Sequence, residues 1–268
     1  MNRFMQWVMA AALICSSTVF ISCMNEDNPV TPANNLSEKI IGKWMTADID
    51  GRPAPTNEKT VMTFLSATKA LVSLSLENAE NNHKQWSDLS EYDVLIEGNK
   101  ITNTNQNGRV KFINEFIVNS INDAEMICNF KHTTLINGET KEVFEQVLRL
   151  EKVVDDYHQA VVGIWQGHCT SEGSIFDDGQ EHRWQYNADG TYVYYVKDSD
   201  NWVPNEDNTL NEYFVDGNLL CTRWIDRGQE NREWWEITIS GDKMNWTALR
   251  ANKDGSTYTA TFEMKKVE

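Results

Sequence analysis

Positive charge is scarce in this sequence. Its 24 Lys and Arg residues stand against 40 Asp and Glu residues, which gives a formal net charge of -16 at pH 7. No cluster of Lys and Arg interrupts this balance, and a surface of this sign repels nucleic-acid phosphates and anionic lipid headgroups. The composition therefore argues against a nucleic-acid partner, and it predicts that any membrane contact uses something other than a basic patch.

Catalytic motifs are also missing. The chain has no phosphate-binding glycine loop, no Gly-x-Ser-x-Gly turn and no His-Glu-x-x-His pair. His168 and Cys169 are neighbours, but adjacent residues of a strand point to opposite faces and do not converge on a metal or a substrate. His182 lies in an acidic stretch that we interpret as a solvated loop. We therefore expect no catalytic residues, no metal and no cofactor, and we rank an enzyme below a binding protein.

Cysteine is sparse, with five residues in the chain. Cys15 and Cys23 belong to the N-terminal region described next, which leaves Cys128, Cys169 and Cys221 for the folded part. An exported protein can oxidise one pair, and Cys169 with Cys221 is the pair within the second half of the chain. Sequence does not supply the geometry of a disulfide, so this bond and buried free thiols both remain open.

The N-terminus carries the one long run of apolar and small residues, from Met5 to Ser22, after the single charge of Arg3. This layout is typical of a secretory signal peptide, here residues 1–22. A retained membrane helix needs roughly 20 apolar residues, which makes this run marginal in length. The run ends in Phe20, Ile21, Ser22 and Cys23, which resembles the lipobox of bacterial lipoproteins. That resemblance implies that Cys23 is lipidated, and a plain cleaved signal is the main alternative.

Residues 23–36 follow as a tether rich in Asn and Pro, with little to bury, and we expect them to be disordered. Several acyl chains on Cys23 would make membrane attachment effectively permanent. Glu26 and Asp27, close to this cysteine, resemble the acidic export signal of Bacteroidetes surface lipoproteins. We therefore expect an outer-membrane lipoprotein of the cell envelope, displayed at the surface if that signal operates.

After the tether, the chain repeats itself. IIGKWM at 40–45 recurs as VVGIWQ at 161–166, and each segment opens a stretch of about 115 residues. Further matches keep the same order and align Phe64 with Tyr186, Gly98 with Gly217, and Met126 with Met244. Such a series predicts two copies of one domain, at residues 37–153 and 154–268.

Both copies have the pattern of antiparallel β-structure. In TYVYYVK, Tyr192 and Tyr194 alternate with Val193 and Tyr195, as the two-residue period of a strand requires. Turn dipeptides such as Asp189-Gly190 separate the runs of alternating residues. The second copy contains eight such runs, at 162–170, 181–186, 191–197, 210–215, 218–225, 232–239, 244–250 and 257–265. Eight strands in so short a domain predict a small barrel, whose interior is filled by side chains or holds one small ligand.

The two copies resemble the lipocalin-like, or calycin, domains of Bacteroidetes lipoproteins. The resemblance rests on two Gly-x-Trp motifs, Gly42-Lys43-Trp44 and Gly163-Ile164-Trp165. It implies an all-β fold of two tandem antiparallel eight-stranded barrels, each closed at its base by the tryptophan, with the glycine allowing close passage beneath it. It also implies an arginine stacked over each tryptophan. Arg149 is the candidate in the first copy, and Arg250 in the second.

Aromatic residues are divided unequally between the copies. The second copy holds seven of the ten tryptophans and seven of the eight tyrosines. We interpret the first barrel as a packed spacer or an apolar-ligand site, and the second as the more specialised one. Trp234 and Trp235 must face opposite sides of their strand, and Trp235 is the one expected inside. Trp202 lies in a polar stretch that we interpret as a loop, where packing gives an aromatic ring little reason to be.

The candidate ligand contacts are therefore Trp202, Trp234, Trp235, Tyr192, Tyr194 and Arg232. Simple core and cross-strand packing is the alternative for each of these rings. The sequence predicts a lipid-anchored binding protein whose second barrel takes a small hydrophobic or amphipathic ligand. The alternative is a surface accessory or interaction protein with filled barrels, for which a glycan is a possible partner.

Overall fold

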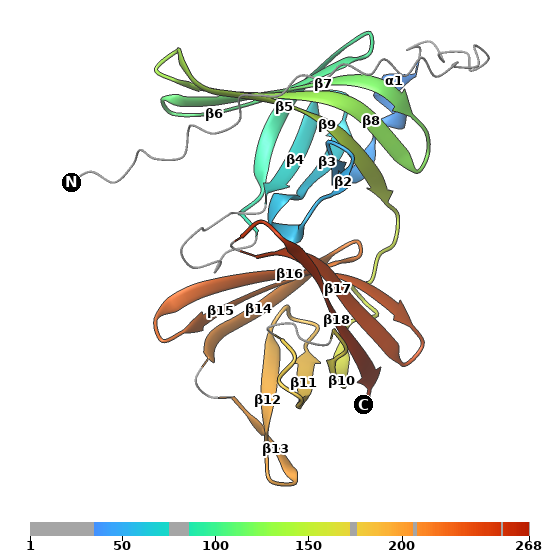
Figure 1. Cartoon of the computed structure of the whole chain (residues 1–268), viewed down its shortest axis with the longest axis vertical. Coiled ribbons are helices and arrows are strands. Elements are labelled where there is room, and N and C mark those ends of the chain that lie inside the picture. Colours follow the sequence, from blue (N-terminus) through green and yellow to red (C-terminus); the bar gives the residue numbers. More distant parts are fainter. Residues whose placement is uncertain (1–34, 75–85, 172–175, 206–207, 253, 268) are drawn as a thin grey trace. The chain divides into compact units, whose positions relative to one another are not determined.

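The computed structural model describes residues 35–74, 86–171, 176–205, 208–252 and 254–267. The predicted signal peptide, the lipidation site Cys23 and nearly all of the tether lie outside these residues. Within them, the chain is built almost entirely of antiparallel β-strands, which form two separate sheets in chain order (Figure 1). No helix in this described part is long and apolar enough to cross a membrane.

The first repeat forms a sheet that closes on itself. Its elements are α1 (Leu36–Lys39), β1 (Gly42–Ile49), β2 (Arg52–Pro53), the 3-10 turn η1 (Thr56–Glu58), β3 (Thr60–Ser66), β4 (Lys69–Leu74), β5 (Ser90–Glu97), β6 (Lys100–Asn107), β7 (Val110–Ile121), β8 (Glu125–Ile136) and β9 (Glu139–Val153). Each strand from β3 to β9 pairs with the next, and β1 pairs with both β3 and β9. The predicted closed barrel of eight strands is confirmed here, with β2 added beside β1.

The second repeat forms a curled sheet of nine strands. They are β10 (Gly163–Cys169), β11 (Glu181–Tyr186), β12 (Tyr192–Asp198), β13 (Asn201–Pro204), β14 (Asn208–Asp216), β15 (Leu219–Asp226), β16 (Gln229–Ser240), β17 (Lys243–Ala251) and β18 (Thr257–Lys266). Eight of them match the predicted runs closely, and β13 was not predicted. Where β12 meets β14 the ladder is replaced by one bridge, between Thr191 and Glu212. This sheet therefore curls into a barrel without a full seam.

Strand pairing confirms the internal repeat. Gly42 lies opposite Phe64 on β3, and Gly163 lies opposite Tyr186 on β11, which are the residues that the repeat aligns. Met126 lies opposite Leu150, and Met244 opposite Met264. The two sheets thus share one register over their first strand, second strand and final hairpin.

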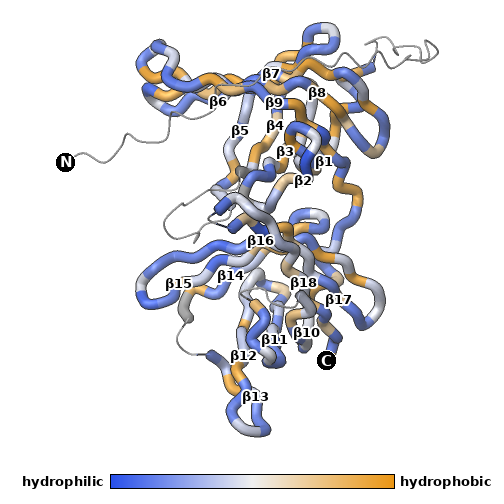
Figure 2. The backbone as a smooth tube through the Cα atoms, in the orientation of Figure 1, coloured by the Kyte–Doolittle hydropathy of each residue, from blue (hydrophilic) through white to orange (hydrophobic). Residues whose placement is uncertain are grey.

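Alternate residues of each strand fill the two interiors. Along β17, Met244, Trp246 and Ala248 are buried while their neighbours are more exposed. Figure 2 shows hydrophobic and hydrophilic residues succeeding each other along many strands, with hydrophilic residues at the hairpin tips. Each repeat therefore has its own apolar core, as the two-residue period predicts.

Two buried tryptophans occupy equivalent places at the starts of the sheets. Trp44 and Trp165 are both fully buried. The indole nitrogen of Trp44 donates a 2.7 Å hydrogen bond to the carbonyl of Ile40, and that of Trp165 donates an equal bond to the carbonyl of Val161. Each ring is thereby fixed to the segment that precedes its own strand.

Lysines, and not the expected arginines, lie over these rings. Lys152 Nζ is 5.2 Å from the Trp44 centroid, and Lys266 Nζ is 5.2 Å from the Trp165 centroid. Lys152 pairs directly with Trp44 across β1 and β9, whereas Arg149 lies an odd number of residues away and faces the other side. Arg149 instead forms ion pairs with Asp48 and Glu151.

Arg250 is also placed differently from the prediction. It follows Met244 by six residues on β17, which separates it by about 20 Å from the end of the strand near Trp165. Its guanidinium lies 4.6 Å from the centroid of Trp235 instead.

The two Gly-x-Trp motifs require glycine at their first position. Gly42 has φ +118°, and an added Cβ would lie 3.0 Å from Lys152 Cε. Gly163 has φ +134°, a conformation that other residues rarely adopt.

Candidate functional site

The interior of the second sheet contains a cavity of about 180 Å³ with an aromatic wall. Four tryptophans line it, Trp184, Trp224, Trp235 and Trp246, together with three tyrosines, Tyr186, Tyr192 and Tyr194. Thr222 and Glu233 complete the lining. On each of β11, β12, β15 and β16, the two lining residues are two positions apart. The pleat of the strands therefore turns all of these side chains inward.

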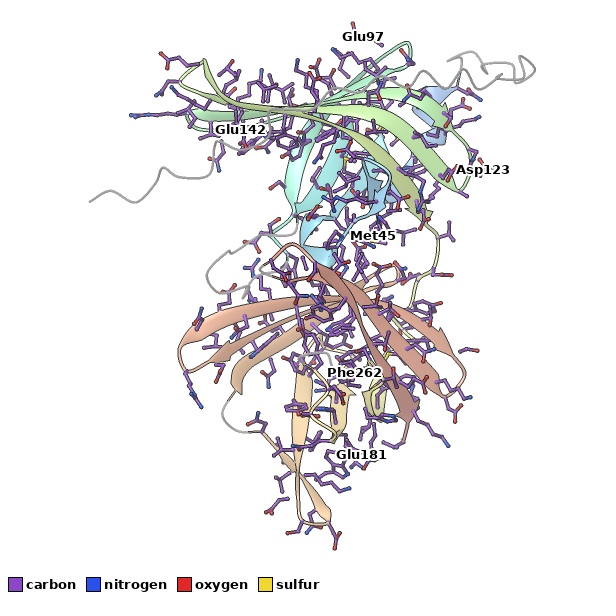
Figure 3. All side chains as sticks on the ribbon, in the orientation of Figure 1. Met45, Glu97, Asp123, Glu142, Glu181 and Phe262 are labelled. Carbon is purple, nitrogen blue, oxygen red and sulfur yellow. The ribbon has the colours of Figure 1, made fainter. Side chains whose placement is uncertain are left out.

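The aromatic rings of this wall contact one another. The centroids of Trp184 and Trp246 are 4.8 Å apart, and those of Trp235 and Trp246 are 5.5 Å apart. Phe262, labelled in Figure 3, packs beneath them with its centroid 5.5 Å from that of Trp235. Each such pair contributes roughly 0.5–1.5 kcal/mol beyond the buried area. The wall is therefore held in place by its own ring contacts.

Glu233 is the one charged residue among those that line this cavity. Its Oε2 accepts a 3.0 Å hydrogen bond from Trp235 Nε1, and its Oε1 lies 3.9 Å from Arg250 Nη2. Arg250 lies over the Trp235 ring and does not line the cavity, and burial lowers the pKa of its guanidinium. The polar feature that the cavity presents is thus a carboxylate set among aromatic rings.

The tyrosines of the wall are neutral groups. Burial raises the pKa of Tyr186 well above its ordinary value, and it also raises the pKa of Tyr192. The hydroxyl of Tyr194 is 2.9 Å from His182 Nδ1. The Tyr186 hydroxyl and Trp246 Nε1 are buried without a hydrogen-bond partner in the described part of the chain. A buried donor without a partner costs about 1–3 kcal/mol of stability. Such donors are therefore unusual within a protein core.

Three of the six predicted contact residues meet at this cavity. Tyr192, Tyr194 and Trp235 all line it, and Trp235 shares the interior with Ile237, as its strand pattern indicates. Five further lining residues were not predicted from the sequence: Trp184, Trp224, Trp246, Tyr186 and Glu233. A signal for the aromatic ones was present in the sequence. They recur two positions apart on strands whose buried face the alternation of residues indicates.

Trp234 and Arg232 lie on the opposite face of β16, away from the cavity. Trp234 is buried in a cluster with Leu219 and Cys221, and residues of the first repeat, among them Trp86, belong to the same cluster. The Arg232 guanidinium lies 4.4 Å from the Trp86 centroid. Both residues are thus covered by other parts of the same chain and do not face the cavity.

Trp202 belongs to a strand, so its assignment to a loop was wrong. Ser199 has φ +57° and starts a tight turn that pairs Trp202 with Lys197. The Arg183 guanidinium lies 4.6 Å from the Trp202 centroid, and Lys197 Nζ lies 5.8 Å from it. His182 was likewise assigned to a loop, but it lies on β11 and stacks on Trp184 with centroids 5.4 Å apart.

The first sheet encloses a larger cavity, of about 420 Å³. One part of its wall is apolar and comprises Ile49, Met62, Val72, Tyr92, Phe116 and Leu148. Another part is polar and comprises Asn114, His132, Thr134, Glu142 and Gln146. The polar residues lie toward the hairpin ends of β7, β8 and β9, where Figure 3 labels Glu142. Phe112, Phe130 and Phe144 line the cavity beside these polar residues, and Thr46, Glu58 and Thr60 complete the lining. Polar side chains are therefore set among apolar ones in this wall.

His132 is the centre of the polar wall. Its Nδ1 is 2.7 Å from Asn114 Oδ1, and its Nε2 is 2.8 Å from the Thr134 hydroxyl. Phe144 stacks on the imidazole with centroids 4.9 Å apart. Burial lowers the pKa of His132, which favours the neutral ring. An Nδ1–H that donates to the amide oxygen leaves Nε2 as the acceptor for the hydroxyl of Thr134.

A second buried amide lies within the same barrel. Asn103 is fully buried on β6, opposite Asn114 of β7. Its side-chain nitrogen lies 3.6 Å from Met62 Sδ, a residue of the cavity wall, and its oxygen has no hydrogen-bond partner in the described residues. No ligand contact was predicted in the first repeat, since its aromatic content is low.

The three cysteines of the described chain form no disulfide with one another. Cys128 and Cys221 are buried, and Cys169 is half-buried. Burial raises the pKa of Cys128 to about 12 and raises that of Cys221 as well. Of the two possibilities that the sequence left open, the structure lacks the Cys169–Cys221 bond.

Comparison with known proteins gives distant structural similarity. No protein-family model matches the sequence, and no curated protein matches it. A transferrin-binding protein B mutant from Haemophilus parasuis is 10% identical with a TM-score of 0.23, and the match covers 84% of this chain and 58% of that one. A DUF3598-family protein from Nostoc punctiforme is 9% identical with a TM-score of 0.22, over 84% and 95% of the two chains. A putative AttH from Nitrosomonas europaea is 9% identical with a TM-score of 0.21, over 83% and 91%. The case for a function therefore rests on the two cavities.

Proposed function

We propose that this protein is a lipid-anchored binding protein of the cell envelope that holds a small amphipathic ligand inside a β-barrel. The observation that carries the proposal is the 420 Å³ cavity of the first repeat, whose largely apolar wall also contains a group of polar side chains around His132. Its volume falls within the range of about 300–1,000 Å³ typical of small-molecule sites. The anchor at Cys23 and the envelope location are supported by the N-terminal sequence alone.

The two parts of the wall suit an amphipathic ligand. Apolar groups would lie among Met62, Val72 and Leu148, while a polar head would lie near His132 and Gln146. A ligand that buries about 300 Å² of apolar surface gains roughly 7 kcal/mol at 25 cal/mol per Å². Loss of the ligand's translational and rotational freedom opposes this gain. A Kd in the micromolar range corresponds to a binding free energy of about -8 kcal/mol, and we expect the ligand to reach it only when polar contacts add to the apolar gain.

The position of the site differs from the sequence-based expectation. That expectation assigned the ligand to the second barrel, because aromatic residues concentrate there. The second cavity is smaller, about 180 Å³ against about 420 Å³. The first repeat therefore fits an apolar-ligand site better than a packed spacer, and it is the better candidate for an amphipathic ligand.

Displacement of a fluorescent probe tests the proposal. We would use N-phenyl-1-naphthylamine with full-length protein carrying Cys23→Ala, so that no attached acyl chain binds the dye. Val72→Trp directs a large side chain into the cavity and is expected to weaken probe binding at least tenfold. Gln146→Trp blocks the polar part of the wall and serves if Val72→Trp does not fold. Leu95→Trp, at a position 55% exposed on β5, is the matched control.

Two results would contradict a ligand site in the first repeat. One is the absence of saturable probe binding by the parent protein. The other is equal binding by the parent, the folded blocking variants and the Leu95→Trp control. Interaction with a surface glycan, the rival role, predicts instead that glycan-array binding is retained when the cavity is blocked.

A further inference from the structure

We propose that the aromatic cavity of the second repeat is a separate binding site, for a small organic cation with a quaternary or methylated ammonium group. This inference goes beyond the amphipathic ligand proposed for the first repeat, because it concerns other residues and another class of ligand. Seven of the nine lining residues are aromatic, and the remaining two are Thr222 and Glu233. A wall of this composition is electron-rich on its ring faces and carries one formal negative charge.

Aromatic faces attract cations when the charge lies within about 6 Å of a ring centroid. The attraction is strongest for tryptophan and increases when the cation is removed from water. Four tryptophans line this cavity, and Trp235 and Trp246 are almost fully buried. A cation inside it would therefore contact several ring faces at once and be partly removed from water, since Trp184, Tyr194 and Trp224 are half-buried.

The protein's own cation shows that this wall accepts positive charge. The Arg250 guanidinium lies 4.6 Å from the Trp235 centroid and 5.7 Å from that of Phe176. It is held there by a 3.2 Å hydrogen bond from Nη2 to the carbonyl of Trp234. Its distance of 3.9 Å from Glu233 leaves a long ion pair, and Arg250 is not among the lining residues. The carboxylate thus contributes to the cavity wall while the guanidinium does not.

Size and polarity select the ligand class. The volume of about 180 Å³ is below the usual range of about 300–1,000 Å³, so an acyl chain or a drug-sized molecule does not fit. A sugar needs several hydrogen-bonding partners, and the two groups of this wall without a partner in the described residues, the Tyr186 hydroxyl and Trp246 Nε1, are too few for it. The Tyr194 hydroxyl is already bonded to His182 and the Glu233 carboxylate to Trp235. A methylated ammonium group presents a compact, apolar surface with a diffuse positive charge. It needs ring faces and one carboxylate, and this wall has both.

Choline and its neutral isostere test the proposal directly. The full mature chain, extracted in a non-ionic detergent without ammonium groups, would be titrated with choline while tryptophan fluorescence is recorded. The same titration with 3,3-dimethylbutan-1-ol supplies a ligand of equal shape and no charge. We expect saturable choline binding, with the isostere binding at least tenfold more weakly. Equal binding of the two would overturn the cation site, as would saturable binding of glucose with no response to choline.

Two substitutions place the site. Trp224→Leu removes a half-buried lining ring and is expected to weaken choline binding about tenfold, while Trp202→Leu, a tryptophan outside the cavity, should leave it unchanged. Glu233→Gln removes the negative charge and should weaken choline more than the neutral isostere. If folded Trp224→Leu protein binds choline like the parent, the assignment is wrong. Val72→Trp in the first repeat should leave choline binding intact, so the failure of either site is distinguishable from the failure of the other.

Discussion

Replacing the buried residues Trp44 and Trp165 with phenylalanine gives a sharp test of the repeat. In Trp44→Phe, the Ile40 carbonyl loses its 2.7 Å indole donor, and leaving such a group unpaired costs about 1–3 kcal/mol. The contact with Lys152 at 5.2 Å is weakened, because phenylalanine attracts a cation less than tryptophan does, and this costs up to about 0.5 kcal/mol. The smaller ring leaves a void that costs about 1 kcal/mol more. We expect a total loss of about 3 kcal/mol in the free energy of unfolding.

Trp165→Phe should behave alike, because its hydrogen bond and its lysine contact have the same lengths. Urea unfolding followed by far-ultraviolet circular dichroism measures both variants. A loss of about 3 kcal/mol corresponds to a midpoint lower by roughly 6 °C or more in a thermal scan. Because two repeats can unfold in two steps, each variant should displace the step of its own repeat.

Trp202→Phe is the control, since this ring is half-buried and contacts its cations on a strand hairpin. It should lose no more than about 1 kcal/mol. If the Trp44→Phe and Trp165→Phe variants lose no more than this control, the indole bonds and lysine contacts do not stabilise the two sheets. A large loss in one repeat and none in the other would contradict their equivalence.

Three further changes test the remaining assignments. Cys23→Ala should abolish labelling of the protein by a palmitate analogue, and persistent labelling would refute lipidation at that residue. Burial lowers the pKa of His132, so at a pH below the ordinary pKa of histidine the unfolded chain binds more protons than the folded one. The free energy of unfolding should therefore fall from pH 7.5 to pH 5. His132→Gln should reduce this fall in urea titrations, and an unchanged pH dependence would contradict it. An aromatic disulfide reagent should label Cys169 in the native protein and leave Cys128 and Cys221 unmodified until unfolding. A Cys169–Cys221 cross-link found by mass spectrometry would contradict the absence of this disulfide.

The strands and the duplication were predictable because both depend on local pattern. Alternation fixes which face of a strand is buried, and the ordered series of correspondences between the repeats fixes the alignment. Tyr192, Tyr194 and Trp235 were found by this means. The lysines over Trp44 and Trp165 were missed because the resemblance supplied arginine, although Lys152 and Lys266 occupy equivalent positions in the repeat.

Other features depend on three-dimensional packing, which pattern does not report. Trp202 looked like a loop residue because its neighbours are polar, but a turn at Ser199 returns the chain against Arg183 and Lys197. Cavity volume was not predictable at all. It is what remains after side chains from many strands have packed, so the aromatic-rich repeat is nearly filled by its own rings while the other repeat keeps the larger space.

The single bridge between Thr191 and Glu212 gives the two cavities different means of access. In the first repeat every wall strand is held on both sides by a ladder, so a ligand must enter past an end of the barrel. In the second repeat, β12 and β14 can part once that bridge and two hydrogen bonds of Tyr213 are broken, from its backbone nitrogen to the Gly190 carbonyl and from its hydroxyl to the Asn187 carbonyl. Local opening follows the path that disrupts the fewest contacts. Because β12 carries Tyr192 and Tyr194, its displacement would widen the aromatic cavity from the side.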